Sequence, residues 1–532
     1  MLKFRLHKAI SILLAVVMLA FVFSACGGSG PEAATGETAS QASSSSSAEP
    51  AASGEPVTLN VFIDHTWYWT DKFEGIIPEE ITKQTGVVLN PTRATDNMQL
   101  GVMIASGDLP DLVYTSQLFD RMSDSNVSYS WSELIKQYTP DFKVDPTQET
   151  IARSYSADGD FYTVLNAFSS EEDWHNAKAG CPTLGTLMYR QDIVDELGAG
   201  PINTLEGYVA AMEKVKAKYP DITPLVLEYS FPLDVFKTWL IPGWLPITSG
   251  LMQTADNKII HYTSTPEYPA FLKTINDWYR KGFISADNFT FTDGSQAEQL
   301  AQNNKAFSYT FCTGDANSGF TEATKKNGFD KALWVQSQPL VAGAQYYTVG
   351  TGWAGVFITK NNSNPEKSIK LMQWMFSEAG QRLTQWGREG ADYTMGSDGI
   401  PVFSDDWIAA RNDEKLFYTK YNPAYYFGIS AVTEAVGRAS GISQNAKDVM
   451  DTIRANLHLV TAPALVEPKG DSNEKVTLDQ IVEFVKNQEI KVILSKSDEQ
   501  FQTNLNEMKQ NLEKMGVKQL EDTLTKEAEK YK

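Results

Sequence analysis

The sequence contains little cysteine and little histidine for its length. Its 532 residues include three cysteines, Cys26, Cys181 and Cys312, and five histidines. Three cysteines are too few for a disulfide framework or a cysteine-rich zinc site. No two histidines have the short helical spacing with which a metalloprotease binds zinc. The sequence predicts no metal centre, and Cys181 and Cys312 form either one disulfide or two buried thiols.

Positive charge is also scarce. Lys and Arg number 46 against 66 Asp and Glu, which gives a formal net charge of −20. An acidic chain is poorly suited to the phosphates of a nucleic acid or to an anionic membrane surface. We therefore expect no nucleic-acid partner. With 42% apolar residues, the chain is long enough for two or more domains with full cores.

Known catalytic and nucleotide-binding motifs are missing. The sequence has neither the G-x-S-x-G turn of serine hydrolases nor a phosphate-binding G-x-x-x-x-G-K-[ST] loop. Gly350, Gly352 and Gly355 fit G-x-G-x-x-G, but the residues 356–359 that follow are typical of a strand, whereas dinucleotide binding needs a helix there. We expect no cofactor. Paired carboxylates for glycoside hydrolysis stay open, because their separation is spatial.

The N-terminus has the pattern of an export signal. Three basic residues precede an apolar run over residues 9–23, which is shorter than the roughly 20 residues that cross a bilayer. The small residues Ser24 and Ala25 before Cys26 resemble a bacterial lipobox, so Cys26 is the predicted lipidation site. Residues 1–25 are then a lipoprotein signal peptide, and residues 26–56, rich in Ser, Ala and Gly, are a disordered linker.

Beyond residue 56, strand and helix patterns alternate. Val57–Ile63 is an apolar, β-branched run typical of a strand buried on both faces. A helix over 73–85, a strand over 87–89, a short helix capped by Asp96 and a strand over 112–114 follow. Later helices begin at Thr204, at 265–267, at 364–366 and at Ser497. The pattern predicts a helix-rich α/β fold.

Aromatic residues are the positive signal, with 12 Trp and 22 Tyr. Trp278 and Trp374 occupy apolar positions of periodic helices, which predicts that they belong to the core. Other rings lie at strand ends and in loops, where flat faces stack on pyranose rings beside short polar side chains. The predicted saccharide-binding rings are Trp67, Tyr68, Trp69, Trp174, Trp244, Trp353, Trp386 and Tyr425.

Several short motifs resemble one protein family. They are ASGDLPDL at 105–112, DGDFY at 158–162, YRQD at 189–192, TPEY at 265–268 and WGREG at 386–390. In their order and spacing they are similar to the family 1 extracellular solute-binding proteins, and within that family to the LplA-type lipoproteins of Gram-positive oligosaccharide importers.

The resemblance implies a two-lobed, periplasmic-binding-protein-like fold of type II with a hinge between the lobes. Residues 57–165 and about 355–455 would form the N-terminal lobe, and about 167–352 and 462–532 the C-terminal lobe. Trp67, Trp69, Trp386, Arg388 and Glu389 match regions that border the family's cleft. The resemblance also implies a monomer that docks on the permease subunits of an ABC importer. The calcium loop of many relatives is replaced by residues 218–223, which hold one carboxylate, too few for calcium.

Together these features predict a lipid-anchored receptor on the extracellular face of the membrane of a Gram-positive bacterium. It would bind a saccharide or oligosaccharide and catalyse no reaction. Two alternatives stay open: a membrane-tethered, glycan-active hydrolase, and a binding protein for a non-sugar solute such as a peptide.

Overall fold

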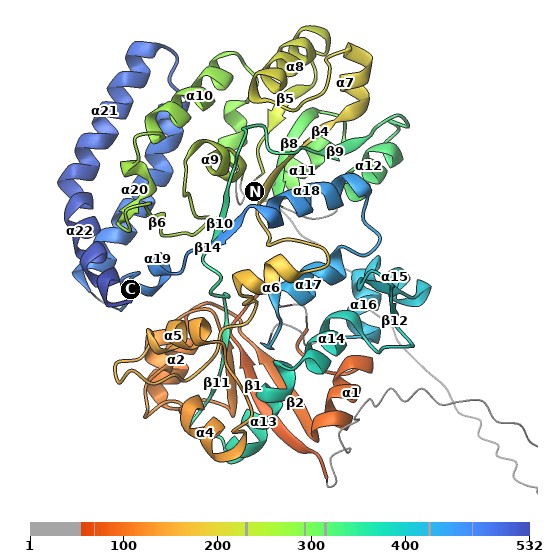
Figure 1. Cartoon of the computed structure of the whole chain (residues 1–532), viewed down its shortest axis with the longest axis vertical. Coiled ribbons are helices and arrows are strands. Elements are labelled where there is room, and N and C mark those ends of the chain that lie inside the picture. Colours follow the sequence, from red (N-terminus) through yellow and green to blue (C-terminus); the bar gives the residue numbers. More distant parts are fainter. Residues whose placement is uncertain are drawn as a thin grey trace, which may run out of the picture. The chain divides into compact units, whose positions relative to one another are not determined.

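Two four-stranded sheets organise the chain in its computed structural model, which describes residues 55–68, 70–228, 232–291, 294–312, 316–423, 427–470 and 472–531. The signal peptide, Cys26, most of the linker, Trp69 and Tyr425 fall outside these residues. Figure 1 shows one lobe around each sheet, which confirms the predicted two-lobed α/β class.

The first stretch of chain supplies three strands of one sheet and the helices that surround them. Its elements are β1 (Val57–Ile63), α1 (Ile76–Thr85), β2 (Val87–Arg93), α2 (Gln99–Ser106), β3 (Leu112–Thr115), α3 (Phe119–Met122), α4 (Trp131–Tyr138), α5 (Pro146–Arg153) and α6 (Glu171–Asn176).

The second stretch supplies the other sheet. Its elements are β4 (Gly185–Arg190), α7 (Gln191–Leu197), α8 (Leu205–Lys218), β5 (Thr223–Val226), α9 (Asp234–Leu240), β6 (Leu251–Gln253), β7 (Ile259–His261), η1 (Tyr262–Ser264), α10 (Tyr268–Arg280), η2 (Ala286–Thr290), α11 (Gly294–Gln302), β8 (Ala306–Cys312), α12 (Ala316–Lys326), β9 (Trp334–Gln336) and β10 (Tyr346–Thr348).

The last stretch returns to the first sheet and then ends on the second lobe. Its elements are β11 (Gly355–Ile358), α13 (Pro365–Met375), α14 (Glu378–Trp386), β12 (Tyr393–Met395), β13 (Pro401–Phe403), α15 (Asp405–Arg411), α16 (Glu414–Lys420), α17 (Ala431–Arg438), α18 (Gln444–Ala455), β14 (Leu457–Leu459), α19 (Ala462–Leu465), α20 (Asn473–Ile493), α21 (Asp498–Met515), α22 (Val517–Ala528) and η4 (Glu529–Tyr531).

The N-terminal lobe is the part built on the sheet with strand order β11-β3-β1-β2. Strand β1 pairs in parallel with β2 and β3, and β11 is antiparallel to β3. Leu59, Val61 and Ile63 of β1 enter the main core of this lobe, whereas Phe62 enters a smaller cluster on the other face. The predicted burial on both faces holds for the C-terminal half of β1, whereas Thr58 and Asn60 on the second face are exposed.

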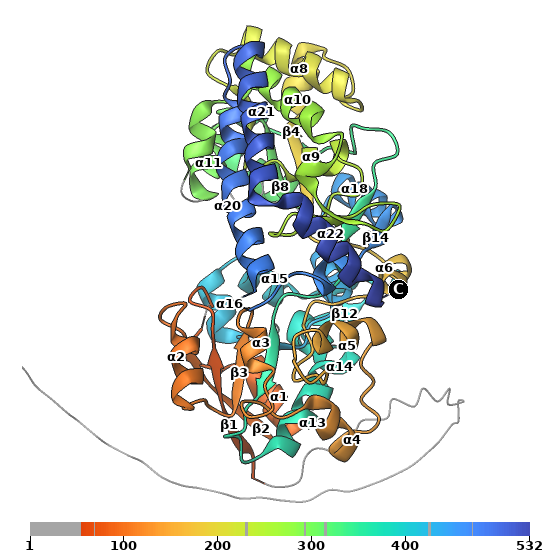
Figure 2. The ribbon, with the colours of Figure 1, turned by 90° about the vertical axis from the view of Figure 1, so that its left-hand side faces the viewer.

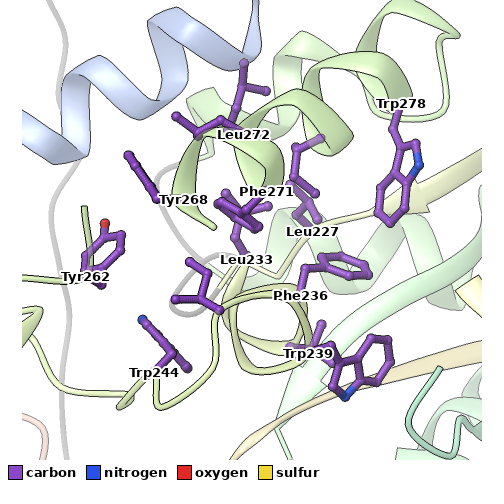
Figure 3. Close-up of a cluster of buried hydrophobic side chains, with 14 of the residues drawn as sticks. Leu227, Leu233, Phe236, Trp239, Trp244, Tyr262, Tyr268, Phe271, Leu272 and Trp278 are labelled. Carbon is purple, nitrogen blue, oxygen red and sulfur yellow. The ribbon is translucent and has the colours of Figure 1, made fainter. Parts of the chain in front are cut away.

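The C-terminal lobe is built on the sheet with order β5-β8-β4-β9. Its core gathers aromatic rings from α9, α10 and the segments around them, including Phe236, Trp239, Trp244 and Trp278 (Figure 3). Helices α20 and α21 run beside each other along this lobe (Figure 2), and α20 contacts α10. The C-terminal residues therefore complete a core that begins near residue 187.

Helix ends follow the predicted signals in most places. Thr204 accepts a hydrogen bond from the backbone N–H of Gly207, and Ser497 accepts one from Gln500. Two predicted starts are corrected. Gly75, with φ of 118°, delays the first helix to Ile76. Asp96 accepts from the N–H of Met98 in the turn before α2, which begins at Gln99 without a side-chain cap.

Segments that connect the two sheets lie side by side. Leu165 forms an antiparallel bridge with Gly355, Phe168 a parallel bridge with Ser430, and β10 pairs in parallel with β14. Within the described ranges, no helix is both long and apolar enough to span a bilayer.

Candidate functional site

Four rings form an aromatic shelf where β1 and β3 end. The shelf consists of His65, Trp67, Tyr114 and Trp353. The ring centroids of His65 and Trp67 are 5.1 Å apart and stacked, and those of Trp67 and Trp353 are 5.8 Å apart. Tyr114 meets Trp353 edge-on at 6.0 Å. Open α/β sheets bind ligands at the carboxyl ends of their parallel strands, which is where this shelf lies.

The shelf borders a pocket of about 690 Å³. Trp67 and Ser116 follow strands of the first sheet, whereas Thr183 precedes β4 of the second, so the pocket has walls from both lobes. The lining residues are Trp67, Ser116, Ala167, Ser169, Trp174, Pro182, Thr183, Thr348, Val349, Gly350, Thr351, Gly352, Trp353, Ala431, Glu434 and Arg438.

Glycine geometry fixes the segment that carries Trp353. Gly350 and Gly352 have φ of 62° and 75°, in the left-handed region that favours glycine. A Cβ on Gly352 would lie 1.8 Å from the backbone oxygen of Asn166. The side chain of Asn166 accepts from the N–H of Ala354 at 3.1 Å and donates to the hydroxyl of Tyr114 at 3.0 Å. These contacts tie the Trp353 segment to the end of β3.

Buried polar groups lie behind the shelf. Oδ2 of Asp64 accepts from Oγ1 of Thr115 and Nε2 of Gln117, both at 2.8 Å, while Oδ1 has no hydrogen-bond partner among the described residues. Burial raises the pKa of Asp64 above its ordinary value. Burial also lowers the pKa of His65 to about 4, so its ring is neutral at pH 7 and stacks as an uncharged aromatic group.

The lining combines indole rings with hydroxyl groups. Trp67, Trp174 and Trp353 supply the indoles, and five Ser or Thr residues supply the hydroxyls: Ser116, Ser169, Thr183, Thr348 and Thr351. An indole offers a flat apolar face, and a hydroxyl both donates and accepts hydrogen bonds. Such a surface suits a ligand that has apolar faces edged with hydroxyl groups.

The predicted ligand-binding residues separate into two sets. Trp67, Trp174 and Trp353 lie together at the pocket, and Trp67 keeps 55% of its surface exposed. Tyr68 is fully buried behind the shelf, and Trp244 lies in the core of the C-terminal lobe (Figure 3).

The predicted residues around 386–389 lie away from this pocket. Trp386 is 4% exposed, and its Nε1 donates to the backbone oxygen of Thr433 at 3.0 Å. Arg388 binds buried Asp392 through Nε and Nη2 at 2.8 and 3.1 Å. Tyr393 contacts Glu389 through its hydroxyl. Packing and local ion pairs therefore occupy these side chains.

Trp386 lines a second hollow, of about 710 Å³, across helix α17. Val432, Thr433 and Val436 face this hollow, whereas Ala431, Glu434 and Arg438 face the pocket with the shelf. The two sets lie on opposite sides of α17, because residues three and four apart share one helix face. Helix α17 thus separates the two hollows.

The polar residues that line the pocket could not be predicted from residue type alone. Ser116, Ser169, Thr183, Thr348, Thr351, Glu434 and Arg438 were not among the predicted ligand-binding residues. Ser and Thr are common in loops, so these residues carry no pattern of their own. The pair of glycines around Thr351 was the one available signal, because two left-handed positions beside a Trp mark a constrained segment.

Cysteine and acidic side chains form no metal-binding cluster among the described residues. Cys181 is a buried thiol, and the side chain of Cys312 lies outside what the structure describes. Within the described ranges, no three His, Cys, Asp or Glu side chains are placed to hold a metal ion together.

The fold and this pocket define a two-lobed binding protein. The family model of the bacterial extracellular solute-binding proteins matches residues 77–388, so the chain belongs to that family. It is an extracellular solute-binding protein of the ABC-transporter type and not an enzyme.

Solved structures with the same fold cover nearly all of the described chain. The alginate-binding protein AlgQ2 without calcium ion matches with a TM-score of 0.64 and 17% identity over 89% of this chain and 98% of its own. FusA of S. pneumoniae, in complex with kestose, matches with a TM-score of 0.63 and 17% identity over 89% of this chain and 99% of its own. A protein of Bifidobacterium longum infantis, described as HMO-binding, matches with a TM-score of 0.64 and 13% identity over 90% of this chain and 99% of its own. No curated protein sequence matches the chain.

Proposed function

We propose that this chain is the substrate-binding lipoprotein of an ABC importer in a Gram-positive bacterium. It captures a saccharide or oligosaccharide in the pocket beside the aromatic shelf and delivers it to a membrane permease. Cys26 carries the lipid anchor, and residues 26–56 form the linker to the two lobes, with residues 57–165 and about 355–455 in one lobe and about 167–352 and 462–532 in the other.

One observation carries the saccharide part of this proposal. Three indoles from distant parts of the sequence, Trp67, Trp174 and Trp353, line the same pocket together with five hydroxyl side chains. A peptide would need buried partners for its backbone amides, whereas a pyranose needs flat apolar faces and short hydroxyl partners. The solved relatives named above include proteins with kestose or alginate in their descriptions, which agrees with this class of ligand.

The mechanism follows from the position of the pocket. A ligand that contacts Trp67 and Ser116 on one side and Thr183 on the other is bound best when these walls are close together. The binding free energy therefore favours the closed arrangement over the open one. The connecting segments at residues 165–168 and 350–355 lie between the sheets and are the proposed hinge.

The test is a binding screen on purified protein. Tryptophan fluorescence and melting temperature are followed against malto-, cello-, manno-, xylo-, fructo- and chito-oligosaccharides of increasing length, with di- to pentapeptides in parallel. We expect at least one saccharide to raise the melting temperature as its concentration rises, as ligand binding to the native state requires. Recovery of that saccharide unchanged would establish binding without turnover.

Other outcomes would redirect the proposal. Binding of peptides and of no saccharide would keep the family assignment and overturn the ligand class. For the anchor, radiolabelled palmitate should enter the wild-type chain in the native host and not a Cys26→Ala variant. Label in that variant would show that Cys26 is not the lipidation site.

A further inference from the structure

The pocket beside the aromatic shelf holds one acid and one base, and the two are paired. Glu434 and Arg438 are the only charged side chains among the described residues that line it. They stand four residues apart on α17, and Nη1 of Arg438 lies 3.1 Å from Oε1 of Glu434. Nη2 of Arg438 donates to Oγ1 of Thr183 at 3.2 Å. Both terminal nitrogens of the guanidinium thus have partners within the protein.

Among the described residues of the opposite wall, no cation lines the pocket, and Arg93 donates from Nη1 to the backbone oxygen of Tyr68 at 2.6 Å. Asp64 lies behind the shelf with one oxygen unpartnered in the described residues, and the groups that act on its carboxyl are Gln117, Thr115 and the acidic Asp96. The chain as a whole carries a formal charge of −20, which repels a polyanion.

Resting on the proposed function, we infer that the pocket selects uncharged saccharides over uronates, and that Glu434 determines this selectivity by occupying Arg438. A carboxylate that enters a pocket loses water and must gain a charged partner in exchange. Arginine supplies that partner best when both ends of its fork are available. Here Glu434 takes one end, and its own charge repels an incoming carboxylate.

Removing the charge of Glu434 should reverse the preference. In a Glu434→Gln variant, Arg438 keeps its place on α17 and loses its competing carboxylate. Glu434 and Arg438 form a partly exposed i,i+4 pair, and such a pair contributes little to stability, so the variant should fold normally. A Glu434→Gln/Arg438→Gln double variant removes the cation as well and serves as the matched control for charge.

A second control separates this pocket from the general surface charge. Glu366 and Lys370 form another i,i+4 ion pair at 2.6 Å on α13, away from the pocket lining. A Glu366→Gln variant changes the net charge of the protein by the same amount as Glu434→Gln. It should leave the affinity for every saccharide unchanged.

The experiment measures dissociation constants by titration calorimetry and tryptophan fluorescence. The probes are the neutral oligosaccharides of the binding screen, together with trimers of galacturonate, mannuronate and guluronate and the methyl-esterified galacturonate trimer. We expect the wild type to bind every uronate at least about tenfold more weakly than its best neutral saccharide. We expect Glu434→Gln to raise the ratio of uronate affinity to neutral-saccharide affinity about tenfold, and the double variant to lose this gain.

The outcomes are distinguishable. A wild type that binds uronates as tightly as neutral saccharides, or a folded Glu434→Gln variant without any gain in this ratio, overturns the inference while a bound neutral saccharide still supports the proposed function. A gain that also appears in Glu366→Gln would assign the effect to net charge and overturn the role of Glu434. If no saccharide of either kind binds, the proposed function fails and this inference fails with it.

Discussion

In the C-terminal lobe, Trp239, Trp244 and Trp278 are between 3% and 7% exposed and belong to one core, whereas in the N-terminal lobe Trp67 keeps 55% of its surface exposed. The difference lies in what covers each ring. The indole of Trp278 packs against Tyr208 of α8 and Phe236 of α9, so it is shielded from solvent. Trp67 follows a strand end at the rim of a pocket, where the rings of His65 and Trp353 contact it.

Tryptophan therefore serves stability in one lobe and, in the proposed function, ligand recognition in the other. A ring in a helix-covered core contributes mainly through the burial of its apolar surface. A half-exposed ring beside a pocket has area left to bury against a ligand.

Truncation of a core ring should cost the most. Trp278 packs edge-on against Phe236 with centroids 5.0 Å apart and against Tyr208 at 5.9 Å. Trp278→Ala should lower the free energy of unfolding by about 3–5 kcal/mol, since it leaves a large cavity. Saccharide affinity of the folded fraction should not change. Urea unfolding followed by circular dichroism measures the first quantity and calorimetry the second, and unchanged stability would remove Trp278 from the core.

Acid should weaken the C-terminal lobe through His261. Burial lowers the pKa of His261 to about 3 and that of His65 to about 4, both below their ordinary value of 6.5. The unfolded chain therefore binds more protons as pH falls below about 6.5, and stability is lost progressively from there toward pH 3, on the order of a few kcal/mol. Above pH 6.5 this contribution is fully present.

Comparison with a variant isolates the histidine contribution. Burial raises the pKa of Asp234 to about 6, which acts in the opposite direction between pH 6 and 3.8 because its protonated form is favoured in the folded state. The wild type should lose more stability between pH 6.5 and 4 than a His261→Gln variant does. Equal slopes in urea unfolding across this range would show that His261 is not buried as a neutral ring.

Altering the connecting segment should have an intermediate effect. Gly352→Ala forces a Cβ to within 1.8 Å of the oxygen of Asn166 at a residue with φ of 75°. We expect a loss of about 1–3 kcal/mol in the free energy of unfolding, together with weaker saccharide binding because Trp353 moves. Gly441→Ala is the matched control, since Gly441 also has positive φ but no atoms within 4 Å of its Cβ position. Equal losses in the two variants would attribute the effect to backbone strain alone.

Removing the exposed ring should affect binding and spare stability. Trp67→Ala should weaken saccharide affinity about tenfold, since one stacking face is lost, and should change the free energy of unfolding by less than about 0.5 kcal/mol. Met98→Ala removes another exposed apolar side chain, outside the pocket, and should change neither quantity. A large stability loss in Trp67→Ala with unchanged affinity would contradict the assignment of the shelf to binding.

The strands were more predictable than the site. Strand β1 has the predicted bounds of Val57–Ile63, because a continuous β-branched run has few other ways to be buried. Trp67 and Trp386 both lie near the end of an element, Trp67 beyond β1 and Trp386 at the last residue of α14. Their different burial depends on tertiary neighbours such as Thr433, which receives the indole N–H of Trp386. Local sequence does not contain that information.

The antiparallel pairing of β11 with β3 constrains how the protein is made. Residues 355–358 pair with residues 112–115, so the first sheet lacks an edge strand until most of the chain has left the ribosome. During that interval the N–H and C=O groups along one side of β3 have no partner strand, and such an edge invites wrong pairings. Contacts this distant in sequence also slow folding. The completion of the first lobe therefore comes after the synthesis of every strand of the second sheet.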